Sequence, residues 1–248
     1  MKKILVINND YHVSQNALKF AVEIAEKETL FGLFVASLKN EDAESYGFPS
    51  DINLTETDFT RATDEQENLD YEKTGIQLFS DTCIESKISF NTHTIHADFL
   101  DTLTDHSAFA DLIICDADNS QKQYSINTLV AHTHCPVLLV NEDYKQIDNI
   151  IFTYDDKSSS IHAIKYFTYL FEFYNHLPVY FVSVVPHNVT GIEYADLIKE
   201  WLPLHYPKAE VVILKGDTKD ELSKFIQCTS QYHSNYGRFW SQFFITLL

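Results

Sequence analysis

Histidines and cysteines are the residues most able to hold a metal, because imidazole and thiolate are the usual ligands of zinc. Five of them lie in two short stretches, His93-Thr94-Ile95-His96 and His132-Thr133-His134-Cys135. The spacings match no known zinc pattern, and a separation of three residues puts His93 and His96 on opposite faces of a strand. His132 stands where a histidine can cap the end of a helix. The sequence therefore predicts no metal site.

Catalysis by a nucleophile requires a serine or cysteine beside a base. No G-x-S-x-G turn occurs in this chain, which holds only six glycines. The four cysteines, Cys83, Cys115, Cys135 and Cys228, are far apart and form no CxxC pair, so they are expected to be buried reduced thiols. We predict that the protein is not an enzyme.

The charge balance narrows the class of partner. The chain contains 18 Lys and Arg residues and 36 Asp and Glu residues, which gives a formal net charge of -18. Such a chain is repelled by nucleic acid and by anionic membrane surfaces, so neither is expected as a partner. The first apolar run, Ile4–Ile7, is too short for a signal peptide core or a membrane span. These features predict a cytoplasmic protein.

A repeated pattern indicates how the chain is organised. The apolar run and polar turn at Lys3–Asp10 return at Asn149–Asp156, and Ser14 and Ser160 each open a helical pattern as a capping hydroxyl. We therefore expect two tandem domains, residues 1–147 and 148–248, with an additional polar stretch from Lys39 to about Tyr71 in the first.

A second repeated segment aligns Ala97–Leu103 with Gly216–Leu222. Each copy has the pattern of a strand, a tight turn and a capped helix. Asp98 and Asp217 are suited to cap these helices, and Asp101 and Asp220 follow in the first turn.

Strands and helices alternate along the chain, which is typical of doubly wound parallel sheets. The second half stops early, because Cys228–Asn235, where a fourth strand should start, contains no apolar run, so its sheet should lack the last two strands. The apolar tail from Phe239 is expected to be poorly ordered, as in a truncated or frame-shifted end. The predicted strands are 2–8, 30–38, 87–96, 111–116, 136–141, 149–154, 178–185 and 209–215, and the predicted helices of the first half are 14–27, 57–82, 98–108 and 122–133.

The first strand, the turn and the Ser-x-x-Ala-Leu helix start within Lys3–Leu18, together with Cys135-Pro136-Val137-Leu138-Leu139-Val140, resemble the universal stress protein family. The resemblance implies an adenine nucleotide alpha hydrolase-like α/β fold with a five-stranded parallel sheet in each repeat. It also implies an internal pseudo-dimer, further assembly into a homo-oligomeric dimer, and a role in stress response. Some members of the family bind ATP and others do not.

The nucleotide-binding members carry an Asp after the first strand and a G-x2-G-x9-G-[ST] loop after the fourth. In the first half Asn9 replaces the Asp, and the loop region Cys115–Lys122 contains no glycine that would let phosphate approach the main chain. Two carboxylates in that region, Asp116 and Asp118, would also repel phosphate. The resemblance therefore implies no ATP site in the first half.

The second half keeps more of this pattern. Asp155 stands at the expected place and Asn235-Tyr236-Gly237-Arg238 resembles the middle of the phosphate loop, so the site implied by the resemblance comprises Tyr154, Asp155, Val184 and Gly237. A plainer interpretation is that Asp155 bonds turn amides.

The function implied is stress-response binding or signalling, with at most a residual ATP site, with Mg, in the second repeat. The alternative is an interaction protein of the same fold that binds no nucleotide. Its apolar tail and the aromatic stretch Tyr166–Tyr174 would then contact partners.

Overall fold

The computed structural model describes residues 2–9, 13–25, 28–35, 73–95, 99–117, 125–141, 144 and 147–234. The chain divides into two compact units, residues 1–135 and 136–248. The predicted domain boundary at residue 147 stays a prediction.

The first sheet has five strands in the order β3-β2-β1-β4-β5. The pairs β1–β2, β2–β3 and β1–β4 are all parallel. The central strands are buried on both faces, which explains continuous apolar runs such as Leu112-Ile113-Ile114-Cys115. The strands are β1 (Lys3–Asn9), β2 (Thr29–Val35), β3 (Ser89–Ile95), β4 (Leu112–Asp116) and β5 (Val137–Val140).

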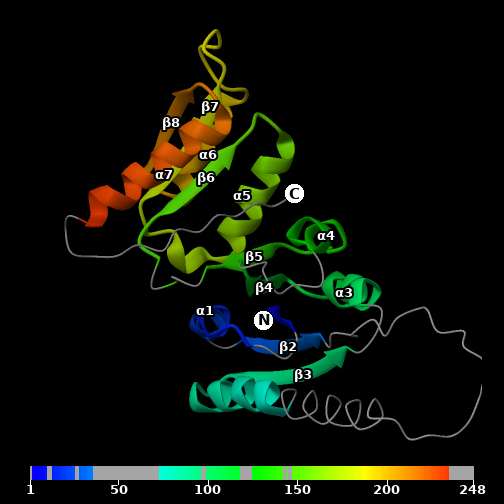
Figure 1. Ribbon diagram of the computed structural model, residues 1–248. Coiled ribbons are helices and arrows are strands. Elements are labelled where there is room, and N and C mark those ends of the chain that lie inside the picture. Colours follow the sequence, from blue (N-terminus) through cyan, green and yellow to red (C-terminus); the bar gives the residue numbers. More distant parts are fainter. Residues whose placement is uncertain are drawn as a thin grey trace, which may run out of the picture. The chain divides into compact units, whose positions relative to one another are not determined.

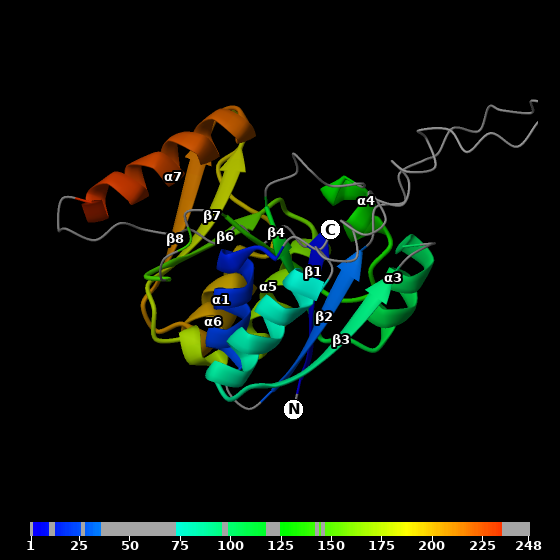
Figure 2. The same cartoon turned by 60° about the horizontal axis from the view of Figure 1, so that its bottom comes forward.

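Helices cover both faces of this sheet, as the alternating pattern predicted. The helices are α1 (Gln15–Ala25), a helix over residues 73–85, α3 (Phe99–Ala108) and α4 (Ile126–Ala131). Helix α1 and the helix at 73–85 lie on one face, and α3 lies on the other (Figure 2). Ser14 opens α1 as predicted, because its hydroxyl oxygen accepts a hydrogen bond from the Ala17 amide at 3.3 Å.

The second sheet has three parallel strands in the order β6-β7-β8 (Figure 1). The strands are β6 (Ile150–Tyr154), β7 (Val179–Val185) and β8 (Ala209–Lys215). The helices are α5 (Ser158–Leu170), α6 (Ala195–His205) and α7 (Thr218–Ser234), with a 3₁₀ turn at Glu172–Tyr174.

Aromatic packing fixes which helix covers which face of the second sheet. The ring of Phe152 on β6 packs against Phe167 of α5 and against Tyr206, which ends α6, with both ring centroids at 5.4 Å. On the opposite face Tyr180 of β7 meets Phe225 of α7 at 5.8 Å. Helices α5 and α6 therefore lie on one face and α7 on the other, which makes this unit doubly wound as well.

The expected loss of the last strands from the second sheet is confirmed. Helix α7 continues to Ser234, so residues 228–234, where a fourth strand would begin, are helical. Among the residues that the structure describes, β6 is consequently an outer strand of its sheet, whereas its counterpart β1 lies at the centre of the first sheet. The tail from Phe239 lies outside the described residues.

The prediction for the cysteines is only partly right. Cys83 and Cys115 are buried, Cys135 is half-buried, and Cys228 is exposed. Cys228 lies on α7, the one helix found on its face of the second sheet in the described part of the chain, so one side of that helix faces solvent.

Candidate functional site

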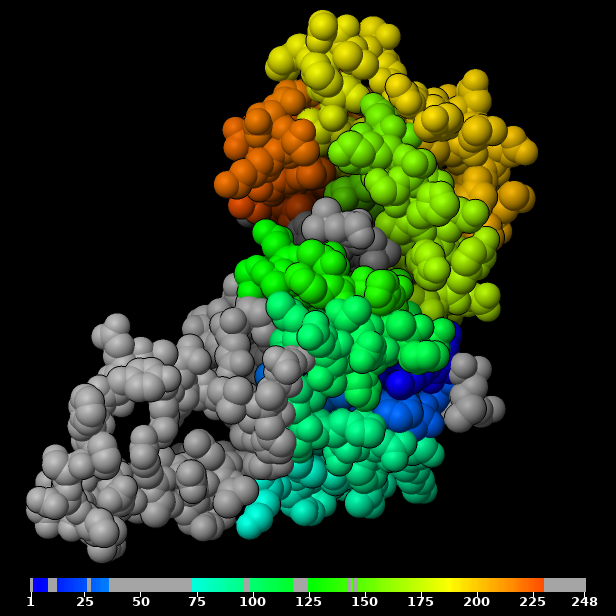
Figure 3. Space-filling view, turned by 90° about the vertical axis from the view of Figure 1, so that its right-hand side faces the viewer, coloured from blue at the N-terminus to red at the C-terminus, as the bar shows by residue number. Residues whose placement is uncertain are grey.

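A cavity of about 570 Å³ opens where β6 and β7 end, a volume within the usual range of small-molecule sites. The carboxyl ends of parallel strands are the usual place for ligands in open α/β sheets. Its lining includes Tyr154, Asp155, Ser160 and Val184, with Thr218 and Leu222 from α7. Ser160 of α5 and Thr218 of α7 both line the cavity. Figure 3 shows the surfaces of these two helices, α7 in orange and α5 in green.

The early end of the second sheet explains why a cavity exists here. Phe167 of α5 lines it from one face of the sheet, and Leu222 of α7 lines it from the other. The hollow therefore reaches both faces around β6. In the first unit β4 pairs with β1 at this place, from Ile4 and Leu112 to Val6 and Ile114.

Asp155 is the first residue after β6 and forms the polar centre of the cavity. Its Oδ1 accepts hydrogen bonds from the hydroxyl of Ser160 and from the amide of Lys157 at 3.2 Å. The Lys157 Nζ lies 2.9 Å from Oδ2. The Ser160 hydrogen bond first, and then Lys157, lower the pKa of Asp155, so the carboxylate is ionised at neutral pH. Half of its side chain, 51%, remains exposed and available to a ligand.

Ser160 does not cap the helix, contrary to the sequence prediction. Helix α5 begins at Ser158 with Lys157 as the N-cap residue, and no side chain bonds at that cap. Ser160 therefore lies inside the first turn, where its hydroxyl donates to Asp155. The repeat suggested the same role for Ser160 as for Ser14, but α5 starts earlier relative to its strand. The plainer interpretation of Asp155 holds in part, because its carboxylate also binds the turn amide of Lys157.

Two side chains beside Asp155 hold the segment that leads into α6. The Tyr154 hydroxyl donates to the Glu193 carbonyl at 3.2 Å, and the Glu193 amide donates to Asp156 Oδ1 at 3.0 Å. Asp156 and Tyr194 both have left-handed backbones, with φ of 62° and 56°, a conformation that costs free energy for residues other than glycine. These bonds fix the rim of the cavity.

Tyr154 acts here as a hydrogen-bond donor. Burial first, and then nearby carboxylates beginning with Asp156, raise its pKa, so the phenol keeps its proton. Because the hydroxyl is bonded to Glu193, Tyr154 offers a ligand its ring and not a free polar group.

The structure brings together three of the four residues predicted for the site. Tyr154, Asp155 and Val184 line the one cavity, and Gly237 lies outside the described residues. Sequence reasoning missed Asp156 and Glu193. The doubled Asp155-Asp156 could have drawn attention to the first, but nothing in the sequence marks Glu193. In the first unit Asn9 ends β1 as expected. The loop with Asp118 lies outside the described residues.

Other predicted features can be placed as well. His132 caps α4, as expected, with its ring Nδ1 2.8 Å from the Thr128 carbonyl oxygen. Asp217 accepts from the amides of Lys219 and Asp220 at the start of α7, as predicted. His96 and Asp98 lie outside the described residues. Within the described part of the chain no three His, Cys, Asp or Glu side chains gather as a metal site would require.

Hydropathy gives one further result. Among the described helices, none is both long and apolar enough to cross a bilayer.

The cavity offers hydrogen-bond acceptors and an apolar wall, but little reactive chemistry. The Ser160 hydroxyl bonds a carboxylate of low pKa, which is a weak base, and the described part of the lining contains no histidine. The arrangement is suited to binding a small molecule with N–H or O–H groups and a flat apolar part.

Comparison with solved structures gives universal stress proteins. One from Archaeoglobus fulgidus DSM 4304 is 14% identical, with a TM-score of 0.62, and the match covers 92% of this chain and 82% of that chain. The universal stress protein UspA from Lactobacillus plantarum is 20% identical, with a TM-score of 0.40, covering 56% of this chain and 97% of that chain. An Arabidopsis thaliana member of that family, solved with AMP bound, is 14% identical, with a TM-score of 0.38. The match covers 57% of this chain and 92% of that chain.

No family model matches the sequence, and neither does any curated protein. The structural match thus supports the resemblance noted in the sequence. The support comes from the Archaeoglobus fulgidus structure, whose match spans both units of this chain. The chain has the parallel-sheet α/β fold of the universal stress proteins, with a shortened second domain.

Proposed function

We propose that this protein is a stress-response binding protein whose second unit binds an adenine nucleoside or nucleotide in the cavity at the ends of β6 and β7. The observation that supports it is that Tyr154, Asp155 and Val184, chosen from the sequence, line one cavity of suitable volume.

The chemistry of the lining suits an adenine ring. The ionised Asp155 would accept hydrogen bonds from the exocyclic amino group or from ribose hydroxyls. Val184 and Leu222 would pack against the flat faces of the base. Residues of this kind bind and orient a ligand, so the proposed role requires no turnover. Four free cysteines suit the reducing cytoplasm, where we place the protein.

A thermal-shift titration tests the proposal. A ligand that binds only the native state adds about 2.7 kcal/mol of stability at 100 times its dissociation constant. Adenosine, AMP and ATP, the last with and without Mg²⁺, would each be titrated to millimolar concentration. We expect at least one of them to raise the melting temperature of the wild type, and Asp155→Ala to abolish the shift.

Asp101→Ala provides the matched control. It removes the same charge from the first turn of α3 in the other unit, so the shift should persist. A wild type that responds to none of these compounds refutes the proposed function. A response that survives Asp155→Ala refutes the site.

Exposed apolar side chains favour a second candidate function, protein association. Leu197 and Leu204 on α6 are 61% and 76% exposed, and Tyr166 and Tyr169 of α5 are also exposed. Such a surface suits assembly into the proposed homo-oligomer or contact with another protein. Light scattering after gel filtration of a Leu197→Glu, Leu204→Glu double variant tests this idea. A mass unchanged from a wild-type oligomer, or a monomeric wild type, would exclude self-association through α6.

A further inference from the structure

The start of α5 borders the cavity, and an ionised carboxylate, that of Asp155, stands beside it. The amide groups at a helix N-terminus attract anions, which is how many proteins bind phosphate. Here the Asp155 carboxylate already accepts from the Lys157 amide at 3.2 Å. The Lys157 ammonium, the one cation among the described residues that line the cavity, is paired with Asp155 at 2.9 Å. An incoming phosphate would meet a carboxylate where it needs donors.

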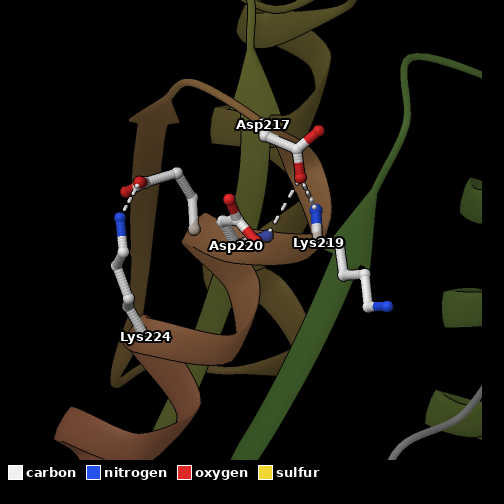
Figure 4. Close-up of polar contacts among 5 residues, drawn as sticks. Asp217, Lys219, Asp220 and Lys224 are labelled. Carbon is white, nitrogen blue, oxygen red and sulfur yellow. Dashed lines mark hydrogen bonds and ion pairs between the residues drawn. The ribbon is translucent and has the colours of Figure 1, made fainter.

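At the start of α7 a carboxylate does bond the amides of the first helical turn. Thr218, its first residue, lines the cavity, and Asp217 just before it accepts from the amides of Lys219 at 2.9 Å and Asp220 at 3.1 Å (Figure 4). The carboxylate of Asp217 thus takes the position that an anionic ligand would use.

Nearby cations do not reverse this charge. Lys224 pairs with Glu221 at 2.6 Å within the same helix (Figure 4). Lys219, like Asp217 and Glu193, stands outside the described lining of the cavity. At the rim, Asp156 and Glu193 add two carboxylates to the field around Tyr154. Among the described residues that line the cavity, the two carboxylates of Asp155 and Asp156 outnumber the one ammonium group, that of Lys157.

From these contacts we infer that the cavity recognises the nucleoside end of its ligand and disfavours a polyphosphate, so that adenosine binds more tightly than AMP, and AMP more tightly than ATP. This inference rests on the proposed function, because it concerns the same cavity. Each added phosphate brings negative charge towards Asp155 and Asp156 in the cavity lining and towards Asp217 at the start of α7. Like charges repel more strongly near a protein surface than in water, and ATP brings several of them, so ATP should bind at least about tenfold more weakly than adenosine.

Calorimetric titration of the full chain with adenosine, AMP, ADP and ATP at one ionic strength, without Mg²⁺, measures the order directly. We expect the dissociation constant to rise with each phosphate. The difference between adenosine and ATP should shrink in 0.5 M salt, because salt screens repulsion between charges near the surface. Added Mg²⁺ should recover part of the affinity for ATP by neutralising its charge.

Charge-removing variants separate repulsion from shape. Asp217→Asn keeps a capping oxygen on α7 while removing its charge, so it should tighten ATP severalfold and leave adenosine unchanged. Asp101→Asn removes one charge from the other unit and should change neither. ATP binding as tightly as adenosine, or an Asp217→Asn variant without effect on ATP, overturns the inference and leaves the proposed function standing. Failure of all four ligands to bind overturns the proposed function itself.

Discussion

A buried hydrogen bond between Tyr206 and Thr168 fastens the end of α6 to α5, the helix that brings Ser160 to the cavity. The Tyr206 side chain is fully buried, and its hydroxyl donates to Thr168 Oγ1 at 2.9 Å. Thr168 in turn donates to the Ile164 carbonyl at 2.8 Å. Burial raises the pKa of Tyr206 to about 12, so the phenol remains a donor. Removing the Tyr206 hydroxyl and removing the Thr168 hydroxyl should therefore lower the free energy of unfolding by different amounts.

Tyr206→Phe removes the donor but leaves the Thr168 hydroxyl bonded to Ile164, so no buried polar group loses its only partner. The expected loss in the free energy of unfolding is about 1 kcal/mol, the net value of one hydrogen bond. Thr168→Val keeps the shape but leaves the Tyr206 hydroxyl buried without its acceptor, which costs about 1–3 kcal/mol. The double variant should be no less stable than Thr168→Val alone, because it no longer contains the Tyr206 hydroxyl that lacks an acceptor in Thr168→Val.

Urea unfolding, followed by Trp201 fluorescence in a Trp240→Phe background, measures these differences on α6 itself. Thr229→Val is the matched control, since Thr229 also donates to a helical carbonyl, that of Phe225 at 2.8 Å. It should cost less than Thr168→Val, because no buried tyrosine depends on it in the described structure. Tyr206→Phe costing as much as Thr168→Val, or strictly additive losses in the double variant, would refute the reasoning.

Burial, and then Lys3 and His93, lower the pKa of His106. Because unfolded histidine takes up a proton near pH 6.5 while the folded residue resists it, stability should fall as the pH drops from 7 to 5, and the fall should be smaller in His106→Gln when urea midpoints are followed by circular dichroism. Cys228 is exposed, so a disulfide reagent at pH 8 should label it rapidly in the native protein, and Cys228→Ser should remove that fast phase; an unchanged fast phase would assign it to another thiol. A methyl group on Gly32 would lie 2.9 Å from one phenylalanine ring and 3.1 Å from another, so Gly32→Ala should cost about 1–3 kcal/mol in thermal unfolding, and a neutral effect would show that the rings can move aside.

The sequence predicts the architecture well because hydrophobic periodicity and repetition act together. Buried runs such as Ile4–Ile7 and Leu112–Cys115 identify central strands, and the echo of Lys3–Asp10 at residues 149–156 identifies the second unit. The polar residues from Cys228 onwards correctly predicted that a strand is missing. They did not predict that α7 would extend to Ser234, because the choice between helix and loop there depends on packing against the sheet.

The candidate site is less predictable, because its geometry comes from contacts distant in sequence. The family resemblance implied Tyr154 and Asp155 at the end of one strand and Val184 on the neighbouring strand. Glu193 enters through its main-chain N–H and C=O groups, so the identity of its side chain carries no signal of that role. The repeat predicts a capping role for Ser160 only if both helices start at equivalent positions. The starts of α1 and α5 differ by a few residues, so this prediction is wrong.

The shortened second sheet also bears on how the chain folds. In the first unit Lys3 must meet Asp111, 108 residues away, before the centre of the sheet is complete. In the second unit each strand pairs with the next one along the chain, and Ile150 meets Val179 and Val179 meets Ala209 across only about 30 residues, a separation whose loop closure costs less entropy. Short-range connectivity speeds folding, so the second unit can form its sheet without waiting for a distant strand to return. The omitted strands thus give the later part of the chain a simpler route to its native state, at the expense of the buried centre that the first unit gains.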